Sequence, residues 1–123
     1  MEAYKLGEME QKFADLIWKK EPIASGELAK LCKEAFGWKR TTMYTMLKRL
    51  CLRGIFKNED GVVCALMTRE EFLAAQGEQF LEEHFDGSLP RFLTAFSRRK
   101  RLSGREIAEL KKLIEEYEEG EDG

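Results

Sequence analysis

The stretch from Lys39 to Gly54 constrains the fold of this chain more than any other. Its apolar residues recur at the three- and four-residue spacing of an α-helix and therefore fall on one face, namely Met43, Met46, Leu47 and Leu50. The opposite face carries hydroxyl groups and cations, from Thr41, Tyr44, Thr45, Lys48 and Arg49. Such a helix has to bury one side against other elements while the polar side stays in solvent.

The polar side of this helix has the chemistry that suits the major groove of DNA. Basic groups can meet phosphate or guanine, and a threonine offers a hydroxyl to base edges and a methyl group to thymine. We interpret the segment as a recognition helix. The alternative is an ordinary surface helix whose charged face is simply solvated.

The charge of the chain is distributed unevenly. The formal net charge is −2, yet residues 1–67 contain 12 Lys/Arg against 9 Asp/Glu, whereas residues 68–123 contain 9 against 14. Within the first part, the segment Lys33–Lys57 holds seven cations and one acid, an excess of +6. The N-terminal part is therefore the one expected to meet a polyanion.

The elements before this helix predict a helix-turn-helix. The apolar spacing of Glu8–Lys20 predicts a helix that ends before Pro22, and Ile23–Ala24 leaves room for a short strand. A second helix is expected to start with Ser25 as its N-cap and to end at Gly37. Only three residues, Gly37-Trp38-Lys39, then lead to the recognition helix. They form the short glycine-containing turn that is typical of this motif.

A β-hairpin is expected after the recognition helix. Two short apolar or β-branched runs, 55–58 and 62–67, are separated by Glu59-Asp60-Gly61, and Asp-Gly favours a tight hairpin turn. Three helices followed by a hairpin make a winged helix, with Lys57 on a strand that can reach backbone phosphate. Alternatively, the hairpin serves only to cover the core. The residues expected to contact DNA are Lys39, Arg40, Thr41, Thr42, Tyr44, Thr45, Lys48, Arg49 and Lys57.

Three further helices are expected in the C-terminal part. Capping boxes start one at Thr68 and another at Ser103, and Ser88 with Pro90 starts the helix between them. We therefore expect a winged-helix domain over 1–68 and a helical domain over 69–123.

The C-terminal segment carries many large apolar residues but is too short for a stable core of its own. A second copy of the chain would cover them, and two-fold dimers suit palindromic operators. The alternative is a monomer in which these helices fold back on the winged helix. The residues expected at the dimer interface are Phe72, Phe80, Leu81, Phe92, Phe96, Ile107, Leu110, Ile114 and Tyr117.

A run of four cations, Arg98-Arg99-Lys100-Arg101, resembles a nucleic-acid patch. It coincides with the expected end of a helix, where the helix dipole favours cations. We interpret it as structural or solvated.

Catalysis, cofactors and membrane insertion are not indicated. The chain has no glycine-rich phosphate loop, and its single histidine, His84, has no cysteine near it in sequence. The three cysteines are widely spaced in apolar surroundings, as core thiols are. The longest apolar run, 62–67, is far too short to cross a bilayer, and no signal peptide is evident. We therefore expect a cytoplasmic protein that is not an enzyme and needs no cofactor.

The string Thr42-x-x-Thr45-x-x-x-Arg49-Leu50, together with Leu6-Gly7-Glu8-Met9-Glu10 and Leu16-Ile17-Trp18, resembles the penicillinase repressor family, to which the copper-transport repressors are related. The resemblance extends from Leu6 to about Tyr117. It implies a homodimeric transcriptional repressor with an N-terminal winged helix that reads a palindromic operator. Groove-facing positions would be Thr41, Thr42, Tyr44 and Thr45, and Arg49 would face the DNA backbone.

The chain departs from the pattern of this family at three places. Tyr44 stands where members often have Arg or Lys. Repressors of β-lactamase genes are cut at an Asn-Phe bond by a membrane sensor protease, and the aligned pair here is Ala95-Phe96. The paired Cys-x-Cys motifs of copper-responsive members are missing from this C-terminal sequence.

Two other hypotheses compete with a DNA-binding repressor. The basic face could bind an acidic protein, which would make the chain a winged-helix adaptor that does not bind DNA. Redox sensing by Cys51 or Cys64 would instead require a reactive, partly exposed thiol.

Overall fold

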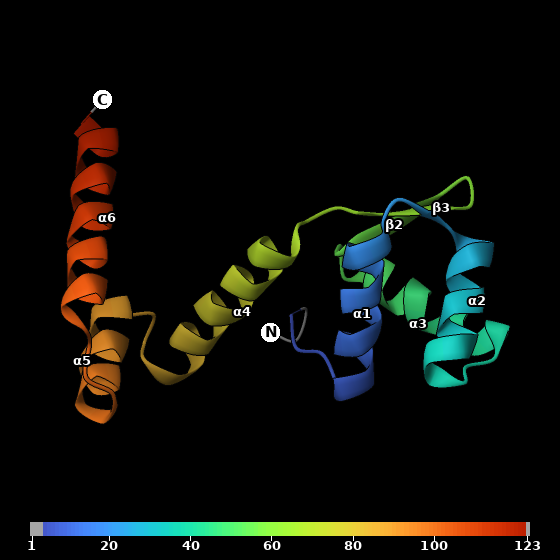
Figure 1. Ribbon diagram of the computed structural model, residues 1–123, viewed down its shortest axis with the longest axis horizontal. Helices are drawn as coiled ribbons and strands as arrows, with labels where there is room; N and C mark the ends of the chain where they lie inside the picture. Colours follow the sequence, from blue (N-terminus) through green and yellow to red (C-terminus); the bar gives the residue numbers. More distant parts are fainter. Residues whose placement is uncertain (1–3, 123) are drawn as a thin grey trace. The chain divides into compact units, whose positions relative to one another are not determined.

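The computed structural model describes residues 4–122 and consists of two compact units, the first ending at Phe80 and the second beginning at Leu81. The predicted fold class is confirmed, because the described residues are mainly helical with one small antiparallel sheet (Figure 1). The elements in chain order are α1 (Glu8–Lys20), β1 (Ile23–Ala24), α2 (Ser25–Phe36), α3 (Arg40–Leu52), β2 (Phe56–Glu59), β3 (Val62–Ala65), α4 (Arg69–His84), α5 (Leu89–Arg99) and α6 (Gly104–Asp122).

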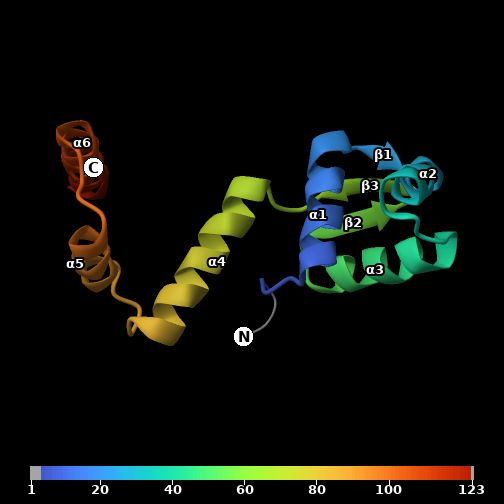
Figure 2. The same cartoon turned by 60° about the horizontal axis from the view of Figure 1, so that its bottom comes forward.

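The first unit is a three-helix bundle closed by a sheet. The strand order is β1-β3-β2, and both pairs are antiparallel, with Val63 opposite Ile23 on one side and Asn58 on the other. Asp60 and Gly61 have φ angles of 54° and 78°, which a tight hairpin turn requires at both central positions. Figure 2 shows the two hairpin strands lying beside α1, α2 and α3.

One hydrophobic core joins these elements. Phe13 and Ile17 of α1, Leu28 of α2 and Val63 of β3 are each fully buried. The other large buried apolar side chains are Ile23, Cys32, Met43, Leu47, Leu50, Ile55, Phe56 and Phe72. Because this core draws on every element of the helix-turn-helix and on the hairpin, it fixes the orientation of α3.

The start of α4 also belongs to this core. The indole Nε1 of Trp18 donates a hydrogen bond to the Met67 carbonyl at 3.0 Å, and the ring of Phe72 lies 5.3 Å from that of Trp18. Arg69 forms an ion pair with Asp15 of α1 at 3.0 Å. This corrects the assignment of Phe72 to a dimer interface, since burial in its own chain leaves it no surface for a partner. For the same reason the first unit extends to Phe80, beyond the expected boundary at residue 68.

The helix starts follow the expected caps with one exception. The capping box at Thr68 is confirmed, because its hydroxyl accepts from the Glu71 amide while the Glu71 carboxylate accepts from the Thr68 amide. The box at Ser103 is formed in the same way. Ser25 differs, since it is the first residue of α2 and Ala24 occupies the N-cap. The hydroxyl of Ser25 is instead engaged by Tyr44 of α3.

The second unit has no core within the described chain. None of residues 81–120 is buried, although α5 and α6 carry large apolar side chains. Leu89 and Phe96 of α5 are 53% and 38% exposed, and Ile114 of α6 is 58% exposed. Aromatic contacts are present, as between Phe92 and Phe96, whose ring centroids lie 5.8 Å apart. Across the described residues, no helix combines the length and apolarity that a membrane span requires.

The position of Phe72 yields a test of the fold. Phe72→Ala should lower the free energy of unfolding of the first unit by about 3–5 kcal/mol, because it leaves a cavity in a closed core. Urea unfolding followed by tryptophan fluorescence measures this, since Trp18 and Trp38 both pack on the core. Leu73→Ala, at a neighbouring side chain that is 40% exposed, should cost much less. A Phe72→Ala destabilisation that appeared only on dilution of the protein would place Phe72 at a subunit contact instead.

Candidate nucleic-acid interface

The structure divides α3 into a buried and an exposed face. Met43 and Leu50 are fully buried and Leu47 is 2% exposed. All nine side chains expected to contact DNA are exposed. The α3 sequence contains no acidic residue, so its solvent face combines Arg40, Lys48 and Arg49 with neutral hydroxyl groups.

The threonine side of α3 forms a shallow hollow that suits base edges. It is lined by Thr41, Thr42, Thr45, Met46 and Arg49. The hydroxyl of Thr45 donates to the Thr41 carbonyl at 2.9 Å. With its hydrogen engaged inside the helix, this oxygen can still accept a hydrogen bond from a base amino group, and the methyl group remains available to thymine.

Tyr44 is held by the preceding helix. Its hydroxyl donates to the Ser25 oxygen at 3.0 Å, and 37% of the residue is exposed. The hydroxyl therefore lies at the N-terminal end of α2, where backbone N–H groups and the helix dipole favour anions. This contact explains how a tyrosine fits a position for which the resemblance implied a longer basic side chain.

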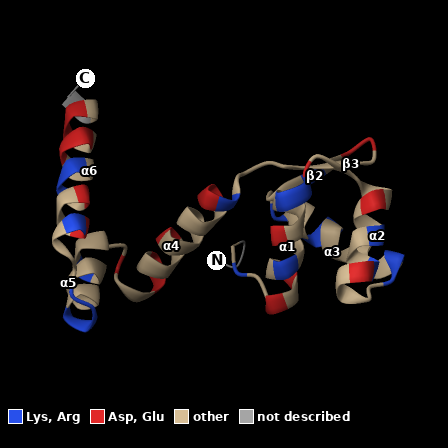
Figure 3. Ribbon diagram, in the orientation of Figure 1, with Lys and Arg blue, Asp and Glu red and all other residues tan. Residues whose placement is uncertain are grey.

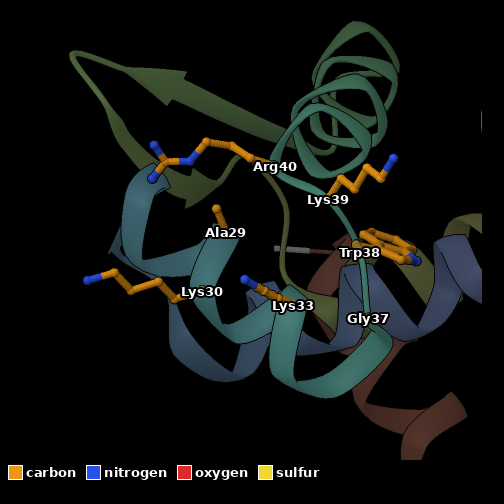
Figure 4. Close-up of a pocket in the computed structure, with 7 residues that line it drawn as sticks. All are labelled: Ala29, Lys30, Lys33, Gly37, Trp38, Lys39 and Arg40. Carbon is orange, nitrogen blue, oxygen red and sulfur yellow. The ribbon is translucent and has the colours of Figure 1, made fainter.

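A basic pocket lies where α2 meets the start of α3. It has a volume of about 400 Å³ and is lined by Ala29, Lys30, Lys33, Gly37, Trp38, Lys39 and Arg40. Four of these seven residues are cationic and none is acidic. Figure 4 shows Lys39 and Arg40 leaving the start of α3 in opposite directions, with Arg40 extending along α2. A phosphate group in this pocket would have lysine and arginine on several sides.

Two of the four cations that line the basic pocket are absent from the sequence-based set. Lys30 and Lys33 lie three residues apart on α2, which places them on one face of that helix. This spacing was the available signal in the sequence, but it does not show that the face adjoins the start of α3. The pocket wall at Trp38 is fixed by packing, because its ring lies 5.2 Å from Phe13 and 5.0 Å from Phe36.

The wing contributes little positive charge. Lys57 is exposed, but its ammonium group lies 3.0 Å from the Glu59 carboxylate. The hydrogen bond and the attraction to Glu59 raise the pKa of Lys57. Asp60 follows at the turn, so the strand and turn carry one cation and two acids. Lys57 therefore has an acidic partner, whereas the lining of the basic pocket between α2 and α3 contains no acidic residue.

The far end of α3 is tied to the N-terminal segment. The guanidinium of Arg53 donates to the Lys5 carbonyl at 3.0 Å and lies 3.6 Å from the Glu10 carboxylate. The amide of Gln76 on α4 donates to the Tyr4 carbonyl at 2.7 Å. Residues 4–5 thereby connect Arg53, the C-cap of α3, with α4.

Burial disfavours the reactive form of two of the three thiols, Cys32 and Cys51. Burial raises the pKa of Cys32 to about 11. Burial also raises the pKa of Cys51, although a hydrogen bond with the Asn58 backbone acts in the opposite direction. Both shifts disfavour the thiolate, which is the reactive form.

The chain matches known proteins over most of its length. The family model of the penicillinase repressor matches residues 6–116. A penicillinase repressor from Bacillus licheniformis is 27% identical over 116 residues, which cover 91% of each chain. The match includes the helix-turn-helix, the hairpin, α4 and α5, and most of α6. The protein therefore belongs to the penicillinase repressor family, a family of transcriptional repressors.

Proposed function

We propose that this repressor acts as a homodimer that binds a palindromic operator through the exposed face of α3. The observation that supports it best is the division of α3 into a buried apolar face and a solvent face of hydroxyls and cations. Major-groove recognition needs both, because the buried face fixes the helix and the solvent face reads base edges.

Phosphate contacts come from both sides of the helix-turn-helix in this proposal. Lys30, Lys33, Lys39 and Arg40 hold one backbone segment at the basic pocket, while Lys48 and Arg49 hold the DNA farther along α3. The hydroxyls of Thr41, Thr42 and Thr45 face the bases. A further phosphate can bind at the N-terminal end of α2, beside the hydrogen bond between Tyr44 and Ser25.

The homodimer rests on the second unit. Helices whose large apolar residues are all partly or largely exposed do not form a stable unit alone in water. The interface residues in this proposal are those of the expected set other than Phe72, which is buried in the winged helix. Two copies joined there would present two α3 helices to two half-sites.

Regulation by a membrane sensor protease would act on α5. The Ala95–Phe96 bond lies inside this helix, and both residues are exposed. Proteases act on locally unfolded chain, so cleavage would require α5 to unwind first. Covering α5 in a dimer would therefore protect the bond.

Removing the basic pocket should weaken DNA binding without changing sequence preference. Lys30→Ala combined with Lys33→Ala should lower the affinity for operator and for random duplex by the same factor. The slope of log K against log salt should also fall in magnitude by about 0.9 for each phosphate that the variant no longer neutralises. Fluorescence anisotropy across a salt series measures both.

The matched control is Lys111→Ala combined with Lys112→Ala. These lysines lie on α6, outside the winged helix, so their loss should leave the slope of log K against log salt unchanged. Failure of the unmodified protein to bind any duplex at micromolar concentration would instead favour a protein-binding adaptor.

Two substitutions on α3 should separate base reading from backbone contact. Thr45→Ala should relax sequence preference at one position of each half-site, since it removes a group that faces the bases. Arg49→Ala should weaken all sequences about equally, because a phosphate contact carries no sequence information. Binding to a randomised operator library gives both profiles, and identical profiles for the two variants would contradict this division of roles.

A charge placed in the apolar face of α6 should produce monomers. Ile114→Glu buries a carboxylate in the proposed interface, so sedimentation equilibrium should show dissociation at concentrations where the unmodified protein is dimeric. Lys112→Glu changes the charge more but lies on the opposite side of α6, and it should leave the dimer intact. Equal behaviour of the two variants would count against this interface.

A further inference from the structure

Residues 4–7, here called the N-terminal strap, lead into α1 and are fastened to the first unit. The side chains of Tyr4 and Leu6 are partly buried against the hydrophobic core. At Gly7, the N-cap of α1, the amide donates a hydrogen bond to a carboxylate oxygen of Glu10 at 3.2 Å. The N-terminal strap is therefore held by its side chains as well as by its backbone.

Two consecutive carbonyl groups of the N-terminal strap bind different helices. The Lys5 carbonyl accepts a hydrogen bond at 3.0 Å from Arg53, the C-cap of α3. The Tyr4 carbonyl accepts one at 2.7 Å from the side-chain amide of Gln76 on α4. Arg53 also lies 3.6 Å from the Glu10 carboxylate. A shift of α4 against the end of α3 would therefore break at least one of these hydrogen bonds, since their geometry tolerates little displacement.

The N-terminal strap holds α4 one turn beyond the contacts at its start. The first turn of α4 is fixed by the Arg69–Asp15 ion pair and by the burial of Phe72, whose ring lies 5.9 Å from that of Tyr4. Gln76 is four residues beyond Phe72 and therefore lies on the same face of the helix. A helix that is held at its start can still pivot there, whereas a hold one turn further along fixes its axis.

The contact between the N-terminal strap and α4 does not depend on charge. Residues 72–77 include no charged residue, and Figure 3 shows this part of α4 in tan between charged residues at its start and further along. The strap offers α4 an aromatic ring and a backbone carbonyl. Salt that weakens DNA binding should therefore leave this contact in place.

The direction of α4 matters because this helix continues beyond the first unit. The first unit ends at Phe80, whereas α4 ends at His84. From Phe72 to His84 the helix rises about 18 Å, so a pivot of about 10° at Phe72 would displace its end by roughly 3 Å. This displacement is close to the rise of one base pair of DNA, which is about 3.4 Å.

We propose that the N-terminal strap is a positioning element that fixes the half-site spacing which this repressor accepts. It joins the end of α3 to α4, so the helix that meets the bases and the helix that leads to the second unit keep one relative orientation. Two copies then present their α3 helices at one separation, and an operator of matching spacing is bound without the entropic cost of ordering a flexible joint. The proposal rests on the homodimer of the proposed function and adds what sets its spacing.

Operators that differ only in the spacing between half-sites test this role. An operator is selected from a random duplex pool with the unmodified protein, and one base pair is then added or removed between its half-sites. Gln76→Ala should lower the affinity for the selected spacing roughly tenfold, yet change the affinity for the altered spacings much less. Its affinity for a single half-site should equal that of the unmodified protein, because α3 is unchanged. Fluorescence anisotropy measures all of these affinities.

A role confined to stability would give a different pattern. If Gln76→Ala only reduced the folded fraction, the affinities for the half-site and for every spacing would fall by the same factor, and the spacing profile would keep its shape. That result would overturn the proposal, and so would a profile that Gln76→Ala leaves unchanged.

Tyr4→Ala loosens the N-terminal strap by a second route, since it removes the ring beside Phe72 but keeps the backbone carbonyl. It should also flatten the spacing profile. Combined with Gln76→Ala, it should cost less than the sum of the two separate effects, because both substitutions act on the same contact. Strictly additive effects would contradict a single strap. If Tyr4→Ala abolishes binding to the half-site as well, the profile of Gln76→Ala decides alone.

Gln11→Ala is the matched control. It removes a hydrogen bond of the same kind, from a part-buried glutamine amide to the Asp15 carboxylate at 3.1 Å, but within α1 and away from the N-terminal strap. The spacing profile should therefore stay as in the unmodified protein. An unmodified protein that binds as a monomer, or that prefers no spacing, would refute the homodimer of the proposed function. Dimeric binding with a profile that Gln76→Ala does not alter refutes only the positioning role.

Discussion

Burial of the inner face of α3 is the constraint on which the rest of the structure depends. Met43, Leu47 and Leu50 enter a core shared with α1, α2 and the hairpin, so α3 can neither rotate nor withdraw without opening that core. Tyr44, Thr45, Lys48 and Arg49, which lie between them in sequence, are thereby held in solvent. The same packing that stabilises the winged helix selects which hydroxyls and cations of α3 face solvent, and a rigid surface of this kind loses little entropy on binding a ligand.

The first half of α4 extends this rigidity toward the C-terminal unit. Phe72 is anchored by aromatic contacts, and Arg69 and Gln76 by polar ones, to α1 and the N-terminal segment. Arg53, at the end of α3, also donates a hydrogen bond to the Lys5 carbonyl in that segment. The orientation of α3 and the direction in which α4 leaves the core are thus determined by one set of contacts.

Local patterns predicted the elements well, whereas contacts between elements were less accessible. Glu8–Lys20 and the Asp60-Gly61 turn follow from apolar spacing and backbone preference alone. The same spacing could not distinguish Phe72 in its own core from Phe72 at a dimer interface, since both bury it. The basic pocket was missed because Lys30 and Arg40 come from different helices. The residue type of Ser25 indicates a cap, and local sequence does not reveal that its hydroxyl bonds Tyr44, 19 residues away.

The positive charges of the winged helix lie in two different electrostatic settings. Cations of α2 and α3 line the basic pocket together, with no acidic residue in its lining, and a bound polyanion would relieve their mutual repulsion. On the wing, Lys57 is instead paired with Glu59. The basic pocket and the wing therefore differ in how much of their positive charge is compensated within the chain itself.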